Sequence, residues 1–184
     1  GYNGHGELGT GNTTWENRPV KITGKKLVTI KDGVTTEEKS VDLGKVIKVD
    51  AWQYMTTVLN KAGEVYVWGY GYGANPVKVN FDKKVIDISG KLLLTEDRKV
   101  YNIDDLRQQI IGLQNIVKIS SGYNHNLALS SDGTVYSWGY NDYGQLGNGT
   151  NTYSASPVKV VNPEGTETLK DIFEISAGSV YSVV

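Results

Sequence analysis

The stretch that decides the fold is residues 116–160, which read IVKISSGYNHNLALSSDGTVYSWGYNDYGQLGNGTNTYSASPVKV. In it, two apolar runs, Leu127–Leu129 and Thr134–Trp138, flank the tetrapeptide Ser130-Ser131-Asp132-Gly133. Asp-Gly between apolar strands is a strong hairpin signal, because both residues tolerate positive φ. We therefore predict a tight hairpin with positive φ at Gly133. The side chains on both faces of these strands are apolar or small, which is typical of strands covered on both sides.

The same pattern recurs along the chain. Val65–Tyr70 repeats Val135–Tyr140, and Val100-Tyr101-Asn102 is a weaker copy. At the start of the chain, residues 1–12 parallel residues 139–150. The weaker copy lacks the turn glycine in Glu96-Asp97-Arg98, so a different type of turn is predicted there. Repeats of roughly 40–50 residues with strand-like content indicate the blades of a propeller.

The composition agrees with an all-β protein and excludes several classes of function. The 184 residues include 12 Tyr, 4 Trp and 22 Gly, which favour strands and turns. The absence of cysteine excludes disulfides, thiolate nucleophiles and cysteine-ligated metals. A net charge of −1 without a basic run predicts no nucleic-acid partner. No apolar stretch reaches the roughly 18 residues that would predict a membrane span.

The order of motifs carries a family resemblance. Gly-x-x-His-x-Leu-Ala-Leu, Asp-Gly-x-Val-Tyr-x-Trp-Gly-x-Asn, Gly-Gln-Leu-Gly-x-Gly and Pro-Val follow one another in residues 116–160, and this order resembles the repeat of the regulator of chromosome condensation (RCC1-like) family. The resemblance implies a β-propeller of four-stranded blades, usually seven. This chain holds about four blade equivalents. The expected divisions are a half blade with an inserted hairpin (1–45), a blade (46–84), a degenerate blade (85–115), a blade (116–171) and a half blade (172–184).

Two segments interrupt the repeat. Residues 24–44 predict an extra hairpin around Asp32-Gly33, with alternating apolar side chains. Residues 104–112 replace the Trp-Gly and Gly-Gln-Leu-Gly motifs of the weaker copy, and we predict one short helix there. Asp104 would be its N-cap, and Gly112 would follow its last turn.

We expect the repeat residues to have structural roles. The resemblance implies that His125 orients a turn by hydrogen bonding, whereas a hydrolase would need a carboxylate and a nucleophile beside it. The glycine-rich loop lacks the Lys-Ser/Thr pair of a phosphate loop, and His5 in the first copy of that loop is expected to be exposed. No spacing suits a metal site, so we predict no enzyme, no cofactor and no metal. The residues assigned to structure are His125, Asp132, Gly133, Trp68, Trp138, Gly144, Leu146 and Gly147.

Aromatic residues at loop positions are the candidates for contact with a partner, because Tyr and Trp provide large, rigid contact areas. They could equally be scattered rings that cover loop backbone. The candidates, with two neighbouring asparagines, are Trp52, Tyr54, Tyr70, Tyr72, Tyr123, Asn124, Tyr140 and Asn141, and Trp15 is of the same kind.

Three functions are compatible with this pattern. The first is a non-catalytic module that binds another protein, and the second is an architectural segment of a larger surface protein without a ligand. The resemblance implies a third, guanine-nucleotide exchange, which is less favoured because it needs features of a complete ring. The short repeats, the missing cysteines and the Tyr/Asn-rich loops look more like the secreted bacterial propellers of this family than the eukaryotic ones, and this resemblance implies a bacterial exported or cell-surface protein rather than a cytoplasmic one.

The two ends of the chain are complementary halves of one repeat. Residues 1–22 lack an inner strand, and residues 172–184 lack a return strand. Because a propeller avoids exposed sheet edges by closing its ring, we predict that these segments share a sheet. The sharing could occur within one chain or between two chains. Two chains are favoured, as a homodimer that completes a propeller of about eight blades.

Overall fold

The computed structural model describes residues 1–22, 27–31, 34–39 and 42–184, and these residues contain strands and turns but no helix. This confirms the all-β prediction. The chain forms two compact units, an N-terminal unit (Gly1–Asn80) and a C-terminal unit (Phe81–Val184). The N-terminal unit contains β1 (Leu27–Lys31), β2 (Val34–Lys39), β3 (Val46–Trp52), β4 (Met55–Asn60), β5 (Val65–Gly69) and β6 (Gly73–Lys78). The C-terminal unit contains β7 (Val85–Ser89), β8 (Leu92–Thr95), β9 (Val100–Asn102), β10 (Ile116–Ser121), β11 (His125–Ser130), β12 (Val135–Gly139), β13 (Ser154–Lys159), β14 (Ser176–Ala177) and β15 (Ser182–Val183).

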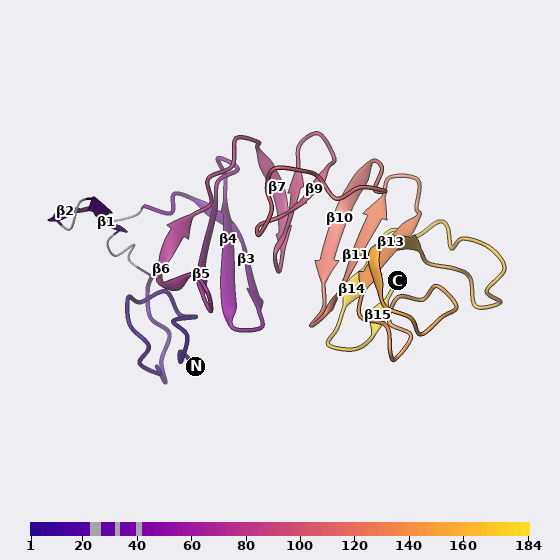
Figure 1. Cartoon of the computed structure of the whole chain (residues 1–184), viewed down its shortest axis with the longest axis horizontal. Coiled ribbons are helices and arrows are strands. Elements are labelled where there is room, and N and C mark those ends of the chain that lie inside the picture. Colours follow the sequence, from indigo (N-terminus) through magenta and orange to yellow (C-terminus); the bar gives the residue numbers. More distant parts are fainter. Residues whose placement is uncertain (23–26, 32–33, 40–41) are drawn as a thin grey trace. The chain divides into compact units, whose positions relative to one another are not determined.

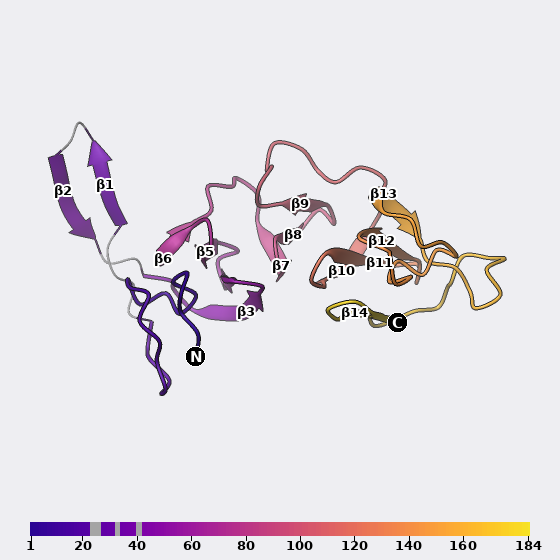
Figure 2. The same cartoon turned by 60° about the horizontal axis from the view of Figure 1, so that its bottom comes forward.

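Each unit is built from antiparallel meanders of consecutive strands, labelled in Figures 1 and 2. Strands β3-β4-β5-β6 form one four-stranded sheet, and β10-β11-β12-β13 form another. Between them in sequence, β7-β8-β9 form a sheet of three strands. A hairpin joins β1 to β2, and a second short hairpin joins β14 to β15.

The two four-stranded sheets have the same register. Met55 pairs with Gly69 across β4 and β5, and His125 pairs with Gly139 across β11 and β12. A β-bulge interrupts the first strand of both sheets near its start, and the three-stranded sheet has a bulge at the corresponding place. The sequence repeat is therefore a structural repeat down to the pairing of single residues.

The turns between the second and third strands are built alike in all three sheets. In the C-terminal unit, Ser130 N donates to Thr134 O, Gly133 N donates to Ser130 O, and Gly133 has the predicted positive φ of 81°. Asp132 does not share this conformation, so the loop is a turn followed by a left-handed residue rather than a two-residue loop.

The prediction of a different turn in the weaker copy is wrong. Thr95 N donates to Lys99 O and Arg98 N donates to Thr95 O, which repeats the same pattern, and Arg98 takes a φ of 63° without being a glycine. Thr95 Oγ1 lies 2.5 Å from Asp97 Oδ1 and 2.9 Å from Lys99 O, so side-chain hydrogen bonding holds this loop in place. Left-handed backbone is costly but accessible to a non-glycine residue when the surrounding structure fixes it.

A steric constraint explains why glycine follows tryptophan in the Trp-Gly motif. Gly69 and Gly139 have φ of 102° and 111°. A Cβ on Gly69 would lie 2.3 Å from the carbonyl oxygen of Tyr54, and a Cβ on Gly139 would lie 2.5 Å from that of Asn124. The neighbouring strand therefore approaches too closely for any side chain at this position.

The core of the C-terminal unit lies between neighbouring sheets. Leu92, Leu94 and Val100 from the three-stranded sheet form one cluster with Ile116, Ile119, Ala128 and Trp138 from the next sheet. Trp138 is 8% exposed, so it packs between sheets. In the N-terminal unit, the fully buried Trp68 forms a cluster with Val58 and Tyr66.

The predicted helix over residues 104–112 is not formed. Asp104 N donates to the side chain of Asn102, and Asp105 pairs with Asn102 in an isolated bridge. Ile110 N then donates to Val100 O, so the end of this segment is hydrogen-bonded to β9. A segment of this length is marginal as an isolated helix, and here the adjacent strand provides competing partners for its backbone.

The inserted hairpin is present as β1 and β2, with Lys31 opposite Val34, and its predicted turn Asp32-Gly33 lies outside the described residues. Residues 1–22 do not form the strand that a sheet shared by the two ends of one chain would need. In the described structure residues 1–22 contain no strand, and β14 pairs with β15. The physical reason is that the C-terminal segment folds back on itself, with Ser176 opposite Val183.

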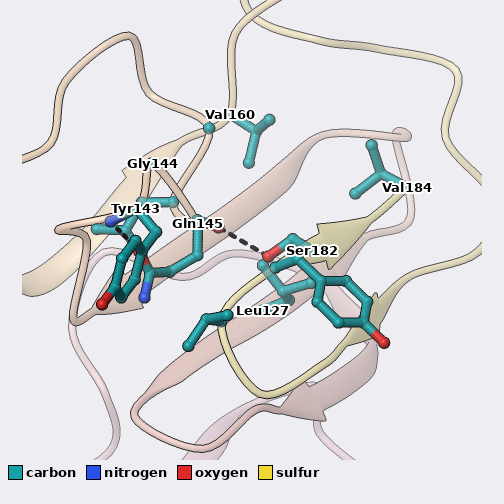
Figure 3. Close-up of a pocket in the computed structure, with 11 residues that line it drawn as sticks. Leu127, Tyr143, Gly144, Gln145, Val160, Ser182 and Val184 are labelled. Atoms are coloured by element: carbon teal, nitrogen blue, oxygen red, sulfur yellow. Dashed lines mark hydrogen bonds between the residues drawn. The ribbon is translucent and has the colours of Figure 1, made fainter.

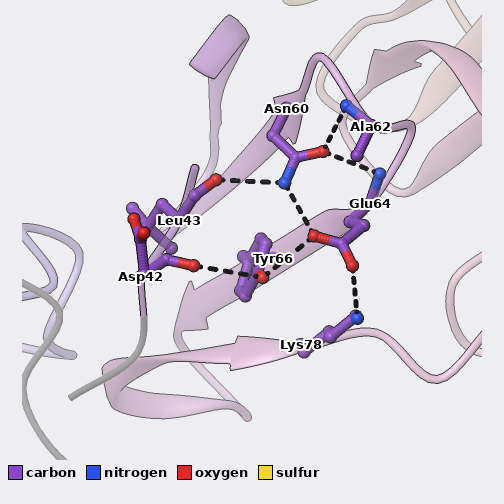
Figure 4. A network of polar contacts seen from close by, with 7 residues as sticks. All are labelled: Asp42, Leu43, Asn60, Ala62, Glu64, Tyr66 and Lys78. Carbon is purple, nitrogen blue, oxygen red and sulfur yellow. Dashed lines mark hydrogen bonds and ion pairs between the residues drawn. The ribbon is translucent and has the colours of Figure 1, made fainter. Parts of the chain in front are cut away.

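A polar network supports the far end of the N-terminal sheet, at the turn between β4 and β5 (Figure 4). Asn60 Nδ2 donates to Leu43 O and to Glu64 Oε2, and the other Glu64 oxygen accepts from Lys78 Nζ at 2.6 Å. The hydrogen bond from Lys78 is the main cause that holds the pKa of Glu64 below its ordinary value, and the bond from Asn60 adds to it. The network connects the segment before β3, the turn between β4 and β5, and the end of β6.

Candidate functional site

Two copies of one glycine-rich loop, residues 1–17 and 139–155, each carry two exposed aromatic rings. A buried asparagine, Asn3 or Asn141, organises each loop, and both are 0% exposed. Asn3 Oδ1 accepts from Leu8 N, and its Nδ2 donates to the carbonyls of Asn12 and Thr14. Asn141 makes the equivalent bonds to Leu146 N and to the carbonyls of Thr150 and Thr152. Each loop is closed by one side chain that satisfies its backbone.

The first loop is attached to the sheet of the N-terminal unit through the backbone of Glu7. Trp68 Nε1 donates to Glu7 O at 2.7 Å, and Thr56 Oγ1 donates to the same oxygen at 2.8 Å. Gly11 N donates to Ala74 O. Glycine is required at position 6, because its φ is 85° and a Cβ there would lie 2.4 Å from Ala74 Cα. This docking fixes the rings of the loop beside Tyr54 and Tyr70, which lie in the turns just before β4 and just after β5.

Five rings meet in the N-terminal unit, and we call them the aromatic cluster: Tyr2, His5, Trp15, Tyr54 and Tyr70. The His5 ring lies at the centre, with centroids 5.0 Å from both Tyr54 and Tyr70 and 6.1 Å from Tyr2. Tyr2 in turn contacts Trp15 edge-on at 5.0 Å. His5 was expected to be exposed, and it is instead partly buried among these rings.

The other four rings of the aromatic cluster are open to solvent. Tyr2 is 47% exposed, Tyr54 48%, Tyr70 65% and Trp15 66%. Tyr54 and Tyr70 were singled out from the sequence, and the backbone of Tyr70 donates to that of Tyr54. Tyr2 and His5 were missed, although Tyr2 is the repeat equivalent of Tyr140 and could have been found from that correspondence.

The other predicted contact residues are placed differently. Trp52 and Tyr72, in the N-terminal unit, are partly buried. In the C-terminal unit, Tyr123 and Asn124 are exposed at the turn before β11, and Tyr140 is partly buried.

Tyr140 contacts Tyr143 at 6.4 Å and donates its hydroxyl to Asp142, and this hydrogen bond raises the pKa of Tyr140. Asn141 cannot serve as a contact residue, because its side chain is the buried centre of the loop described above. In the motif Gly-Tyr-Asn, the tyrosine ring thus lies at the surface and the asparagine amide lies inside the loop.

His125 lines no open catalytic site. It is 1% exposed, and Nε2 lies 2.9 Å from Ser182 Oγ. Ser182 is among the residues of a nearby pocket of about 290 Å³, which also includes Leu127, Tyr143 and Gln145 (Figure 3). A Ser-His pair beside a pocket invites comparison with a hydrolase.

The hydrogen bonds argue against that chemistry. Ser182 Oγ donates its single proton to Gln145 O at 2.7 Å, so His125 Nε2 must donate to Ser182 rather than accept from it. His125 Nδ1 has no hydrogen-bond partner in the described structure, and so no carboxylate orients the ring. Burial lowers the pKa of His125 and favours the neutral imidazole.

The repeat itself supports a structural role for His125. Met55 occupies the equivalent position of the other four-stranded sheet, where it pairs with Gly69 and is 4% exposed. A side chain that cannot transfer protons fills the same space. Among the remaining repeat residues, Leu146 is fully buried, and the carboxylate of Asp132 accepts from Thr134 N.

That backbone hydrogen bond is the main cause of a lowered pKa for Asp132. Within the described ranges, no group of three potential metal ligands and no helix able to span a membrane is found.

The sequence profile of the regulator of chromosome condensation (RCC1) repeat matches residues 116–145, and a second profile of the same repeat matches residues 132–184. The chain is an RCC1-like repeat protein. Its sheets correspond in fold to the blades of RCC1 propellers. The structure of Prp20p from Saccharomyces cerevisiae superimposes with a TM-score of 0.62 at 16% identity, over 74% of this chain and 42% of Prp20p. The structure of human WBSCR16 gives 0.61 at 17% identity, over 96% of this chain and 64% of that one.

Curated relatives show the same repeat in larger proteins. The chain is 28% identical to the ultraviolet-B receptor UVR8 of Arabidopsis thaliana, over 92% of the chain and 43% of the receptor. It is 30% identical to the E3 ubiquitin-protein ligase HERC2 of Homo sapiens, over 75% of the chain but 2% of the ligase. This RCC1-like chain therefore spans less than half the length of these two relatives.

Proposed function

We propose that this RCC1-like chain is a non-catalytic protein-binding module and that its partner docks on the aromatic cluster of the N-terminal unit. The single observation that carries the proposal is the cluster of four exposed rings, three of which contact His5 while Trp15 contacts Tyr2. Tyrosine and tryptophan dominate the energetically important parts of protein interfaces, because they bury a large area at a low entropic cost.

The exposure of these rings separates the binding module from a purely architectural segment. Rings that only stabilised the loops would be expected to lie under other chain segments. Instead, Trp15 and Tyr70 keep about two thirds of their surface in water, at 66% and 65%. Contiguous exposed apolar groups are uncommon on proteins that have no partner.

The relatives support the same class of function. The report of the Prp20p structure names binding to Gsp1p and histones, both of which are proteins. The likeness between Prp20p and this chain concerns the fold, so the identity of the partner does not transfer. We infer from it only the general class of function, which is binding to another protein.

The test is a comparison of captured proteins from the native host. Wild-type protein, the double variant Tyr54→Ala/Tyr70→Ala and the control Tyr143→Ala are immobilised at equal density. Tyr143 is 72% exposed and lies in the equivalent loop, so it is a matched surface substitution. We expect one or more proteins to be retained by the wild type and the control but not by the double variant. Identical retention by all three would contradict the proposal, provided that thermal unfolding shows all three to be folded.

A second candidate is assembly of two chains into a closed ring, which the sequence favoured. Its supporting observation is the exposure of apolar side chains on β3, where Ile47 is 55% and Val49 is 59% exposed, and near the C-terminus, where Phe173 is 85% exposed. These surfaces are of the kind that neighbouring blades cover in a propeller. Light scattering tests this candidate: a mass of two chains supports it, and a single chain at all concentrations contradicts it.

A further inference from the structure

We infer that the aromatic cluster binds a basic segment of the partner, with an arginine side chain held by the rings and by the carboxylate of Glu7. The inference rests on the proposed function and specifies the chemistry of the partner. It starts from one difference between the two copies of the loop, Glu7 against Gln145. Either residue makes the hydrogen bond that the loop needs, so the fold does not explain the charge.

The difference is a charge. In the first loop, Glu7 Oε2 accepts from His5 N at 3.0 Å, and in the second loop Gln145 Oε1 accepts from Tyr143 N at 3.0 Å. A neutral amide therefore performs the local task equally well. Glu7 offers a second oxygen, Oε1, which is buried and has no hydrogen-bond partner in the described structure. A carboxylate oxygen without a donor is costly, and a cationic donor would satisfy it.

The loops that carry the rings are also free of positive side chains. Residues 1–17, 52–55 and 69–75 contain Glu7 and Glu16 but neither lysine nor arginine. The contacts among the rings and the bond from Gly11 to Ala74 bring these three segments together. A surface with negative charges and the electron-rich faces of tyrosine and tryptophan complements a cation.

The groove that Glu7 lines is large enough for a long basic side chain, and Glu7 connects it to the cluster because its carboxylate accepts from His5 N. Glu7 lines a groove of about 540 Å³ in the N-terminal unit, together with Leu8, Val20, Val49, Thr56 and Trp68. An apolar wall beside a carboxylate suits an aliphatic stem with a charged head. Arg18 also lines this groove, but its side chain is exposed, so solvent screens its repulsion of a bound cation.

The orientation of the rings favours a guanidinium over a flat sugar ring. The planes of neighbouring rings in the cluster are inclined by 52–87°, so they do not form one flat platform. Inclined faces can contact a small cation from several sides. Arginine adds two parallel donors that match a carboxylate, which lysine lacks.

The experiment measures binding of three labelled peptides by fluorescence anisotropy at about 0.15 M salt, where nonspecific attraction is screened. The peptides share a Gly-Ser background and carry three arginines, three lysines or three citrullines, the last being neutral and close to arginine in shape. We expect arginine to bind more tightly than lysine, and citrulline to bind at least tenfold more weakly than arginine. The variant Glu7→Gln copies the residue of the second loop, so it keeps the fold. It should weaken arginine-peptide binding at least tenfold, whereas Gln145→Glu should leave it within twofold.

Equal binding of the arginine and citrulline peptides, or unchanged binding by Glu7→Gln, would overturn the inference. So would the absence of arginine-peptide binding at about 1 mM, the range of a very weak specific contact. If the captured host protein still depends on Tyr54 and Tyr70 in that case, the proposed function stands and only the chemistry of the partner is wrong. If capture does not depend on them, the proposed function itself fails.

Discussion

Residues 1–17 and residues 139–155 are two copies of one loop, and their buried parts are built alike around Asn3 and Asn141. Their surfaces differ. His5 in the first loop contacts three tyrosine rings, two of them from turns of the adjoining sheet, whereas its equivalent Tyr143 contacts Tyr140 of its own loop. The repeat therefore fixes the buried scaffold of both loops, while the neighbouring turns decide whether aromatic rings gather into one cluster on it.

The largest loss of stability is expected from substitution of the two repeat tryptophans, Trp68 and Trp138. Trp68 contacts the first loop, whereas Trp138 packs between two sheets. Removal of either buried ring should cost about 3–5 kcal/mol of unfolding free energy. Trp68→Ala should also release the first loop, because Trp68 Nε1 donates to Glu7 O. Trp138→Ala should loosen the packing between two sheets. Chemical denaturation measures both losses, and a loss below about 1 kcal/mol for Trp138→Ala would refute its role as a core residue.

The next effect tests whether the two loop interiors are equivalent. Asn3→Ala and Asn141→Ala should each cost about 1–3 kcal/mol, because each leaves buried backbone groups without partners. The two losses should agree closely, since the two asparagines make the same bonds. A large loss for one and none for the other, in the same denaturation experiment, would show that the loops are not structural equivalents.

A smaller effect comes from the turns shared by the three sheets. Gly133→Val should destabilise by about 1–2 kcal/mol, because a β-branched residue is strained at positive φ. The reverse change, Arg98→Gly, should stabilise by up to about 1 kcal/mol, because it relieves the left-handed backbone of a non-glycine residue. Opposite shifts of the denaturant midpoint are expected, and a loss of stability in Arg98→Gly would contradict the shared turn.

The smallest effect concerns the ion pair of Glu64 and Lys78, which stabilises the edge of the N-terminal sheet away from the loops. Because the pKa of Glu64 is lowered in the folded state, its contribution is present above the unfolded pKa of about 4.5 and disappears as the pH falls through the folded pKa. Wild type should be slightly more stable than Glu64→Gln at pH 7, and the two should converge as the pH falls below the lowered pKa of Glu64 in the folded state. A gap that widens on acidification, as followed by thermal unfolding, would contradict this.

Much of the fold follows from the sequence because the signals are local. Alternating apolar residues and the Asp-Gly turn specify the hairpin from β11 to β12, and the repeat extends this assignment to β4 and β5. Two local predictions failed because tertiary partners compete with intrinsic preferences. Asn102 and Val100 capture the backbone that would have formed a helix at 104–112, and the loop around Thr95 holds Arg98 at a positive φ.

The candidate site could be predicted only in part. Tyr54 and Tyr70 are identifiable as loop aromatics, but the repeat does not reveal that His5 lies between them, because this depends on how the first loop docks on β4–β6. Asn141 illustrates the opposite error. A polar residue in a loop suggests exposure, yet an asparagine amide can satisfy several backbone groups at once and is then buried.

The most direct test of partner docking on the aromatic cluster places a photo-crosslinking residue, benzoylphenylalanine, at one surface position at a time. Tyr70 of the aromatic cluster and Tyr143 of the equivalent loop are 65% and 72% exposed, so they are matched in accessibility. Each variant is irradiated in an extract of the native host, and the adducts are identified by mass. We expect a discrete protein adduct at position 70 and none of that mass at position 143. Adducts of equal yield at both positions, or at position 143 alone, would contradict it.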